Sequence, residues 1–175
     1  MKALSKDQFE TLIEQAQMRP RLKRELRFMA STATMSDEAW SETELLAITD
    51  RSRSKGVLLL APASDIYVLP YELRQGAQNR QTGRSQPIIC DLCRTWQSGS
   101  NAGYVTFQKD RQSINSVSFL CCADLACSQH VRTATASART SRAQLREDLT
   151  DEQRVNRLRN RLQQLIADFE LKPAA

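Results

Sequence analysis

The five cysteines of this 175-residue chain, and its only histidine, all lie in one segment between Cys90 and His130. The segment begins with a CxxC knuckle, Cys90 and Cys93, and a second group of cysteines follows at hairpin distance. Zinc takes four sulfur or nitrogen ligands in a tetrahedron, and two cysteines three positions apart can reach it from one tight turn. A CxxC followed by a second close pair is a strong zinc signal. The sequence therefore predicts one structural Zn²⁺ ion.

The second pair of ligands is best supplied by Cys122 and Cys127, because residues 123–126 would lead from a strand end into a helix start. A thiolate at a helix N-terminus is favoured by the macrodipole. His130 lies one helical turn after Cys127, so a Cys3His site is an alternative. Neighbouring strand residues point to opposite faces, so only one of Cys121 and Cys122 can face the metal, and the other is expected to be a buried thiol. A closed four-ligand shell predicts a structural rather than catalytic role, with His130 on the surface.

The net charge of +5 is unevenly distributed. Such a basic region favours an acidic protein surface or a polyanion as partner. The chain has no apolar run long enough to span a bilayer and no apolar signal-peptide centre, which predicts a cytoplasmic protein without a membrane or small-molecule partner. In a reducing compartment, paired cysteines are more often metal ligands than disulfides. The arginines of the last third are Arg132, Arg139, Arg142, Arg146, Arg154, Arg157, Arg159 and Arg161.

Residues 1–50 are predicted to form a helical N-terminal lobe. Ser5 and Gln8 match a capping box, and the apolar spacing after them indicates a helix to about residue 17. Pro20 interrupts that helix, and a second one is expected to restart next to it. A third short helix is predicted from Ser36, ahead of Trp40 and the pair Leu45-Leu46. Residues 51–56 are interpreted as a linker or turn.

Residues 55–172 are predicted to form a second domain, which makes the chain an α+β protein with a small antiparallel sheet. Strands are expected over 57–61, which Pro62 ends, and over 66–69, where Pro70 would mark the edge or the end of the strand, and a hairpin is expected over 104–119. The stretch 133–138 is expected to be weakly structured. A capping box at Thr150 predicts a C-terminal amphipathic helix, with arginines opposite its apolar stripe. The stripe residues are Val155, Leu158, Leu162, Leu165 and Phe169.

The segment from Ser116 to Ser128, followed by Val131 and Arg132, resembles the treble-clef domain of elongation factor G-binding proteins, the family that includes the fusidic acid resistance proteins. The resemblance covers about residues 57–169. It implies a non-enzymatic zinc finger that binds translation elongation factor G and, in resistance members, helps this factor leave a drug-stalled ribosome. The family pattern assigns the zinc ligands to Cys90, Cys93, Cys122 and Cys127. This sequence departs from the family in its short N-terminal helices and in its few aromatic residues near the knuckle.

The expected contact region for elongation factor G is the hairpin and the residue group after the last ligand, where basic side chains would steer association. Direct binding of RNA or the ribosome through the C-terminal arginines is an alternative, although no stacking platform of aromatic residues accompanies them. An enzymatic reading, with a redox CxxC or hydrolytic zinc, lacks the βαβ setting and the open metal position that it needs. The predicted partner-binding residues are Tyr104, Phe107, Lys109, Arg111, Phe119 and Arg132.

Overall fold

The computed structural model describes residues 1–16, 18–26, 28, 32, 34–76, 83, 85–108, 115–133 and 135–174. Its helices are α1 (Lys6–Gln15), α2 (Pro20–Glu25), α4 (Asp37–Ser41), α5 (Cys127–His130), α6 (Ala136–Leu145) and α7 (Asp151–Asp168), with a 3-10 turn η1 (Gly99–Asn101). Its strands are β1 (Leu45–Thr49), β2 (Lys55–Leu60), β3 (Tyr67–Gln75), β4 (Ile88–Ile89), β5 (Trp96–Gln97), β6 (Ala102–Gln108) and β7 (Ser116–Cys122).

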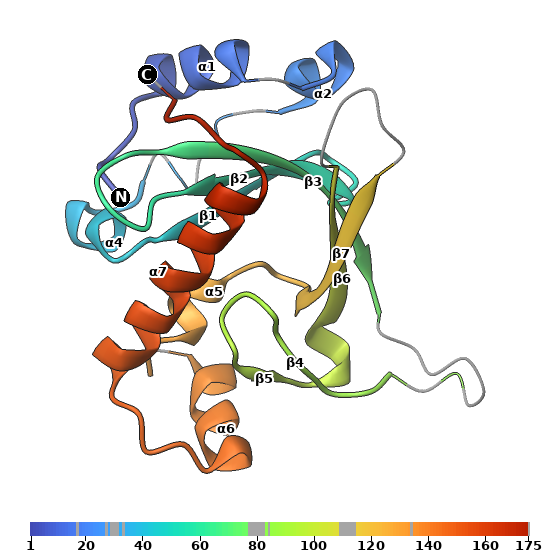
Figure 1. Ribbon diagram of the computed structural model, residues 1–175, viewed down its shortest axis with the longest axis vertical. Coiled ribbons are helices and arrows are strands. Elements are labelled where there is room, and N and C mark those ends of the chain that lie inside the picture. Colours follow the sequence, from blue (N-terminus) through green and yellow to red (C-terminus); the bar gives the residue numbers. More distant parts are fainter. Residues whose placement is uncertain are drawn as a thin grey trace.

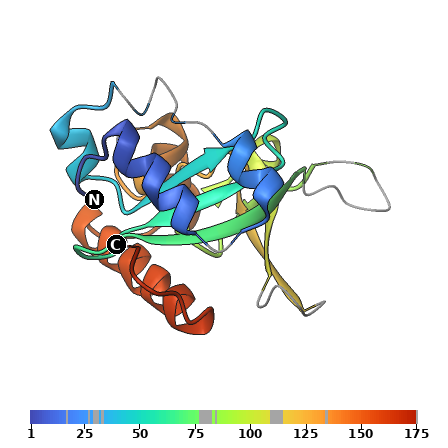
Figure 2. The same ribbon diagram turned by 90° about the horizontal axis from the view of Figure 1, so that it is seen from above.

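Five strands form one antiparallel sheet in the order β1-β2-β3-β6-β7, and β4 and β5 form a separate two-stranded ribbon. Helices α1 and α2 lie over one face of the sheet, and α7 crosses the opposite face (Figure 1). The view from above shows α1 and α2 lying side by side over the strands (Figure 2). The α+β class predicted from the sequence, with a small antiparallel sheet and a C-terminal helix, is confirmed.

Strand β2 separates two apolar cores because alternate side chains of a strand point to opposite faces. Val57 and Leu59 pack with Phe9 and Ile13 of α1, and this group is the N-terminal core. Leu58 and Leu60 belong to a larger cluster on the other face, the zinc-side core. That cluster contains all five cysteines and the α7 residues Val155, Leu158, Leu162 and Leu165, which confirms the predicted apolar stripe.

The first helices follow the sequence signals closely. Ser5 and Gln8 form the expected capping box of α1, which ends at Gln15, while Gln17 lies outside the described residues. Pro20 occupies the first turn of α2, where its missing N–H costs no helical hydrogen bond. Ser36 accepts a hydrogen bond from the Ala39 N–H and caps α4.

The sequence analysis placed Leu45 and Leu46 in the helical lobe, and this was wrong, because they begin strand β1. Leu45 pairs with Leu60 and Leu46 pairs with Leu59 across the β1–β2 hairpin. The short apolar run has no helical period to oppose this pairing, and burial against β2 decides its structure. Residues 1–50 and 55–172 therefore share one sheet, and their division into two domains stays a prediction.

Two further differences come from the rest of the sheet and the helix before α7. Strand β3 does not end at Pro70 but continues to Gln75; β3 pairs with β6 from Glu72 onward, so the proline precedes that pairing. The stretch 133–138 was predicted to be weakly structured, but Ala136 begins α6, which Thr135 caps by accepting a hydrogen bond from the Ala138 N–H. Small residues carried no apolar period, so this helix escaped the sequence analysis.

Candidate metal centre

The thiols of Cys90, Cys93, Cys122 and Cys127 converge, and each of these residues is fully buried. The first two come from the knuckle between β4 and β5, Cys122 is the last residue of β7, and Cys127 is the first residue of α5. The four sulfur atoms all lie within 4.8 Å of one another. This arrangement of knuckle, hairpin and helix start is the one that the cysteine spacing predicted.

The separations between the sulfurs match a tetrahedral zinc shell. Cys93 Sγ lies 3.6 Å from Cys122 Sγ, and Cys90 Sγ lies 4.0 Å from Cys127 Sγ. Four sulfurs that each lie about 2.3 Å from one zinc ion are about 3.8 Å apart. All five cysteines are free thiols, so none is consumed by a disulfide. The four cysteines are therefore positioned to bind one zinc ion, whose role in a closed shell is structural.

Crowding of the four thiols in a buried space perturbs their protonation. Hydrogen bonds from Cys122 and Cys127 hold the pKa of Cys90 well below its usual range. Hydrogen bonds of Cys127 to Cys122 and to Cys90 raise the pKa of Cys127. The neighbouring protonated thiols thus stabilise the thiolate form of Cys90. A zinc ion replaces those protons with one divalent charge, because the thiolate is the ligating form.

A buried polar network holds the knuckle from behind. Thr95 Oγ1 lies 2.9 Å from Cys93 Sγ and accepts a hydrogen bond from Gln97 Nε2 at 2.8 Å. Gln97 Oε1 accepts hydrogen bonds from Asn101 of η1 and Ser137 of α6. Thr95 and Gln97 are fully buried. Such partners orient metal ligands, and here they connect the knuckle to α6.

The knuckle is also joined to strand β7, which carries Cys122. The Asp91 N–H donates to the Leu120 carbonyl at 2.8 Å, and the Leu120 N–H donates to Asp91 Oδ2 at 2.8 Å. Leu92, the other residue between the knuckle cysteines, is fully buried in the zinc-side core. The two ligand pairs are therefore joined by one main-chain hydrogen bond and by one hydrogen bond to the Asp91 carboxylate.

Helix α5 is anchored to the edge strand β1. Ser128 Oγ accepts hydrogen bonds from the N–H groups of Glu44 and Leu45, each at 2.9 Å. Arg132 donates from its two terminal nitrogens to the two Glu44 carboxylate oxygens, both at 2.9 Å, and Arg159 of α7 donates to the same carboxylate at 3.2 Å. The Glu44 side chain is only 2% exposed, so this bidentate pair is internal.

His130 was predicted to be on the surface, but it is buried. Its Nε2 lies 3.0 Å from Asp124 Oδ2, and its Nδ1 lies 3.4 Å from the hydroxyl of Thr135. The ring thus joins the ligand loop to the start of α6, outside the four-sulfur group. The Cys3His alternative is not supported, because four cysteine sulfurs already complete the tetrahedron and the ring is engaged by Asp124.

Cys121 is the buried thiol that strand alternation predicted. It is fully buried and lies outside the four-sulfur group. Burial, assisted by the neighbouring Cys90, raises the pKa of this thiol. A protonated, inert thiol is the expected form in such a place.

Among the predicted partner-binding residues, the four that the structure describes do not form one surface. Tyr104 is 41% exposed on β6, whereas Phe107 is fully buried, because it faces α7 and packs against Phe169 with ring centroids 5.5 Å apart. Phe119 is partly buried beneath the Arg161 guanidinium, 5.0 Å from its ring centroid. Arg132 is held by Glu44. Lys109 and Arg111 lie outside the described residues.

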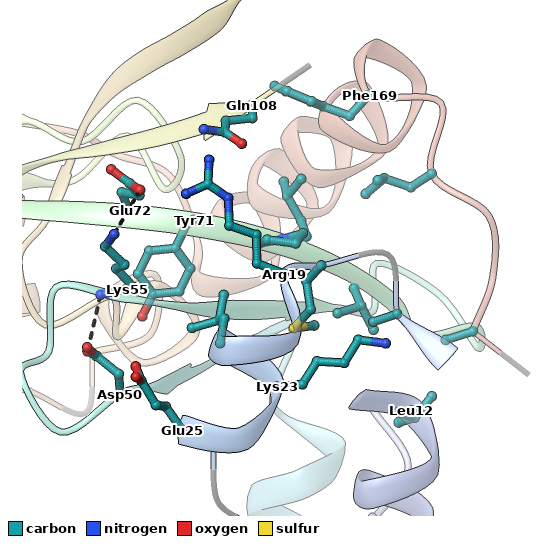
Figure 3. Close-up of a pocket in the computed structure, with 18 of the residues that line it drawn as sticks. Leu12, Arg19, Lys23, Glu25, Asp50, Lys55, Tyr71, Glu72, Gln108 and Phe169 are labelled. Carbon is teal, nitrogen blue, oxygen red and sulfur yellow. Dashed lines mark hydrogen bonds and ion pairs between the residues drawn. The ribbon is translucent and has the colours of Figure 1, made fainter. Parts of the chain in front are cut away.

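A large cleft of about 1450 Å³ lies away from the metal, between the N-terminal helices, strand β3 and the C-terminal residues. Figure 3 shows its lining, with Lys55 joined to both Asp50 and Glu72. Lys55 Nζ lies 3.2 Å from Glu72, and Arg21 Nε lies 2.9 Å from Glu25. These two ion pairs are matched within the wall, and the lining also contains the basic residues Arg19, Lys23 and Lys172 and the acidic residues Asp50 and Glu170.

Sequence analysis did not identify the polar residues that support the site. Thr95, Gln97, Ser128 and Glu44 are all buried. Thr95 and Gln97 follow the knuckle at alternate positions, and Ser128 follows the last ligand; proximity to the cysteines was the signal that could have found these three. Glu44 carried no such signal, because it lies 88 residues from Arg132.

Knuckle, hairpin and short helix around four converging cysteines define a treble-clef zinc finger. The family model described as the FBP C-terminal treble-clef zinc-finger matches residues 18–169. The chain belongs to this family, and the family resemblance drawn from its cysteine segment is thereby confirmed. Neither the curated proteins nor the solved structures yielded a match to the chain. Within the part of the chain that the structure describes, no helix is long and apolar enough to cross a membrane.

Proposed function

We propose that this protein binds translation elongation factor G and acts in the cytoplasm by binding rather than by catalysis. The observation that carries the proposal is the FBP-type treble clef, complete with its four cysteines. A four-sulfur shell leaves zinc no position for a substrate or a reactive water, which favours a binding role. By holding the factor, the protein would promote its release from the ribosome, as the resemblance to the fusidic acid resistance proteins implies.

The zinc end of the molecule offers a surface suited to a protein partner. Two large apolar side chains are exposed in the described residues, Tyr104 at 41% on β6 and Ile89 at 42% on β4. Strand β4 contacts β7, the partner of β6, so both residues belong to the same end of the fold. Protein interfaces combine an apolar centre, often with a tyrosine, with a polar rim. Tyr104 is therefore the strongest of the predicted contact residues.

The proposed contact face leaves out two residues of the initial set. Phe107 is a core residue, and Arg132 is committed to Glu44, so changing either one would disturb the fold before it changed an interface. Lys109 and Arg111 remain predicted contacts that would supply positive charge. A basic rim of this kind would mainly increase the association rate with an acidic surface.

The test is co-elution of the zinc-loaded chain with purified elongation factor G at micromolar concentrations, followed by titration calorimetry. We expect one complex, and we expect Tyr104→Ala to weaken it about ten-fold, as loss of an interface anchor does. Thr106→Ala is the matched control, because Thr106 lies two residues along the same face of β6. Separate elution of the two proteins, with zinc still bound, would refute the proposal.

Release from the ribosome is tested separately. Ribosomes stalled with elongation factor G and fusidic acid are pelleted with and without the zinc-loaded protein. We expect the factor to move from the pellet to the supernatant, and less so with Tyr104→Ala. Binding without any such shift would retain the partner and reject the release activity.

A further inference from the structure

Most of the C-terminal arginines are used inside the fold. Their partners are carboxylates, and several of these pairs are buried. Arg132 and Arg159 bind Glu44, Arg142 binds Asp151, and Arg154, which is 1% exposed, binds Glu147 at 3.0 Å. The arginine-rich tail is therefore not a uniform basic surface, and Arg154 corrects the prediction that the arginines lie opposite the apolar stripe.

Two further C-terminal arginines, Arg157 and Arg161, lie with Arg94 in a groove of about 510 Å³ between the zinc knuckle and α7, here called the α7 groove. Its lining residues are three arginines, two asparagines and two glutamines, so no carboxylate and no apolar side chain is among them. Positions three and four apart lie on one face of a helix, which aligns the six α7 residues along the groove. The lining residues are Arg94, Gln153, Asn156, Arg157, Asn160, Arg161 and Gln164.

The knuckle forms the opposite wall of the groove. Arg94 directly follows the ligand Cys93, has a left-handed backbone (φ 58°), and donates its N–H to the Cys90 carbonyl at 2.8 Å. Its own carbonyl accepts a hydrogen bond from Arg157 of α7 at 3.4 Å. The width of the groove is thus set by the metal knuckle on one side and the helix on the other.

The positive charge of the groove is only partly neutralised. Arg157 donates to Glu147, which lies outside the lining. Arg94 is half exposed and lies 3.8 Å from Asp91, a separation at which an exposed pair contributes little. Arg161 stacks over Phe119 and donates to Gln164, so its guanidinium is held in place without a carboxylate. The guanidinium groups of Arg94 and Arg161 therefore lie on opposite sides of the groove without a strong carboxylate partner.

We propose that the α7 groove binds the phosphate backbone of single-stranded RNA. Guanidinium forks match phosphate oxygens, and they recur where this group is recognised. The amides of Gln153, Asn156, Asn160 and Gln164 can both donate to and accept from ribose hydroxyls and base edges, which favours RNA over DNA. An acidic protein segment fits less well, because protein interfaces need apolar anchors and the lining contains none. This activity is distinct from the proposed binding of elongation factor G.

The test is fluorescence anisotropy with a labelled single-stranded RNA at several salt concentrations, using the zinc-loaded full chain. Two phosphate contacts, from Arg94 and Arg161, predict a slope of log K against log salt of about −1.4, at about 0.7 per contact for a single strand. The double variant Arg94→Gln/Arg161→Gln should weaken binding about ten-fold at low salt and reduce the slope by about 1.4. Zinc content and circular dichroism confirm that the variant is folded.

Arg24→Gln is the matched control, since Arg24 is an exposed arginine on α2, remote from the groove in sequence and fold. We expect it to change RNA affinity less than two-fold, as loss of one distant, screened charge does. Equal weakening by Arg24→Gln and by the double variant would reject the groove as the site, as would absence of RNA binding at low salt. Poly-glutamate that competes as well as RNA would reject RNA as the ligand, and DNA of the same sequence binding equally would reject the preference for ribose.

Discussion

The two faces of the five-stranded sheet are stabilised in different ways. The N-terminal core is a small apolar layer in which Phe9 and Ile13 of α1 pack on Val57 and Leu59. The zinc-side core contains the metal-ligand cysteines and α7, and buried polar groups surround it. Apolar contacts are non-directional, whereas a metal shell and bidentate ion pairs fix geometry. The comparison indicates that precise positioning is concentrated on the face that carries the metal centre and the α7 groove.

Two buried charges, Glu44 and Arg154, belong to the zinc side as well. Glu44 holds Arg132 and Arg159, while Glu147 holds Arg154 and Arg157. Each pair joins α7 or the segment after α5 to another part of the chain. Removal of one partner leaves a buried charge without compensation, which is costly even where the intact pair contributes little. The zinc side should therefore be the more sensitive to single substitutions and to solution conditions.

The largest effect is expected from loss of a zinc ligand. Cys122→Ser should abolish stoichiometric zinc and remove metal-linked stability on the order of 10 kcal/mol, comparable with the whole stability of a small domain. The N-terminal core shares β2 with the zinc side, so we expect it to be lost in the same transition. Metal analysis and thermal unfolding followed by circular dichroism measure both.

Cys121→Ser is the control for this prediction, because Cys121 is adjacent, equally buried and outside the four-sulfur group. It should keep one zinc ion per chain. Full zinc occupancy in Cys122→Ser, or retention of a folded N-terminal core without zinc, would break the proposed contrast between the two faces.

An intermediate effect is expected for Glu147→Gln, which leaves the buried Arg154 guanidinium without its counter-charge. We expect about 3 kcal/mol lower stability at pH 7. Burial opposes ionisation of Glu147, but the Arg157 hydrogen bond and nearby arginine charges outweigh it and lower the pKa of this carboxyl. Its stabilisation is therefore complete above the unfolded-state pKa, about 4.3. The advantage of the wild type over Glu147→Gln should shrink as the pH falls below that value.

Urea unfolding at a series of pH values measures this advantage. Glu14 is exposed on α1, the helix that packs over the N-terminal core, and Glu14→Gln should alter stability by less than about 0.5 kcal/mol at every pH. A wild-type advantage over Glu147→Gln that stays constant down to pH 3 would show that the carboxylate charge does not stabilise the folded state.

The smallest effect is expected from loss of a capping box, a motif that occurs on both faces of the sheet. Ser5 and Thr150 each begin a capping box, at α1 and at α7. Ser5→Ala and Thr150→Ala should each cost about 1 kcal/mol of helix stability. We expect the first to accelerate hydrogen exchange locally in α1 and the second to lower the global unfolding temperature, since α7 is part of the zinc-side core. Thr11→Ala, inside α1, is the control, and equal exchange patterns in both cap variants would contradict the contrast.

Local sequence patterns predicted much of the fold. The Cys90 knuckle, both capping boxes and the α7 stripe were predicted because their signals lie within a few residues of each other. Leu45 and Leu46 were misassigned because a short apolar run fits a helix or a strand equally, and pairing with β2 decided between them. Helix α6 was missed because alanines, serines and threonines show no apolar period.

The chain's own sequence narrowed the zinc ligands to Cys90, Cys93, Cys122 and Cys127, with His130 as the alternative, since tetrahedral coordination accepts few spacings of cysteine. Tertiary structure alone decided the fate of the charged and polar residues. His130 is paired with Asp124, Arg154 is paired with Glu147, and Arg132 is paired with Glu44, which is 88 residues away. Arg132 and Glu44 meet only because distant segments pack, and their burial then requires the two charges to be paired. The same packing left Arg94 and Arg161 on the walls of the α7 groove.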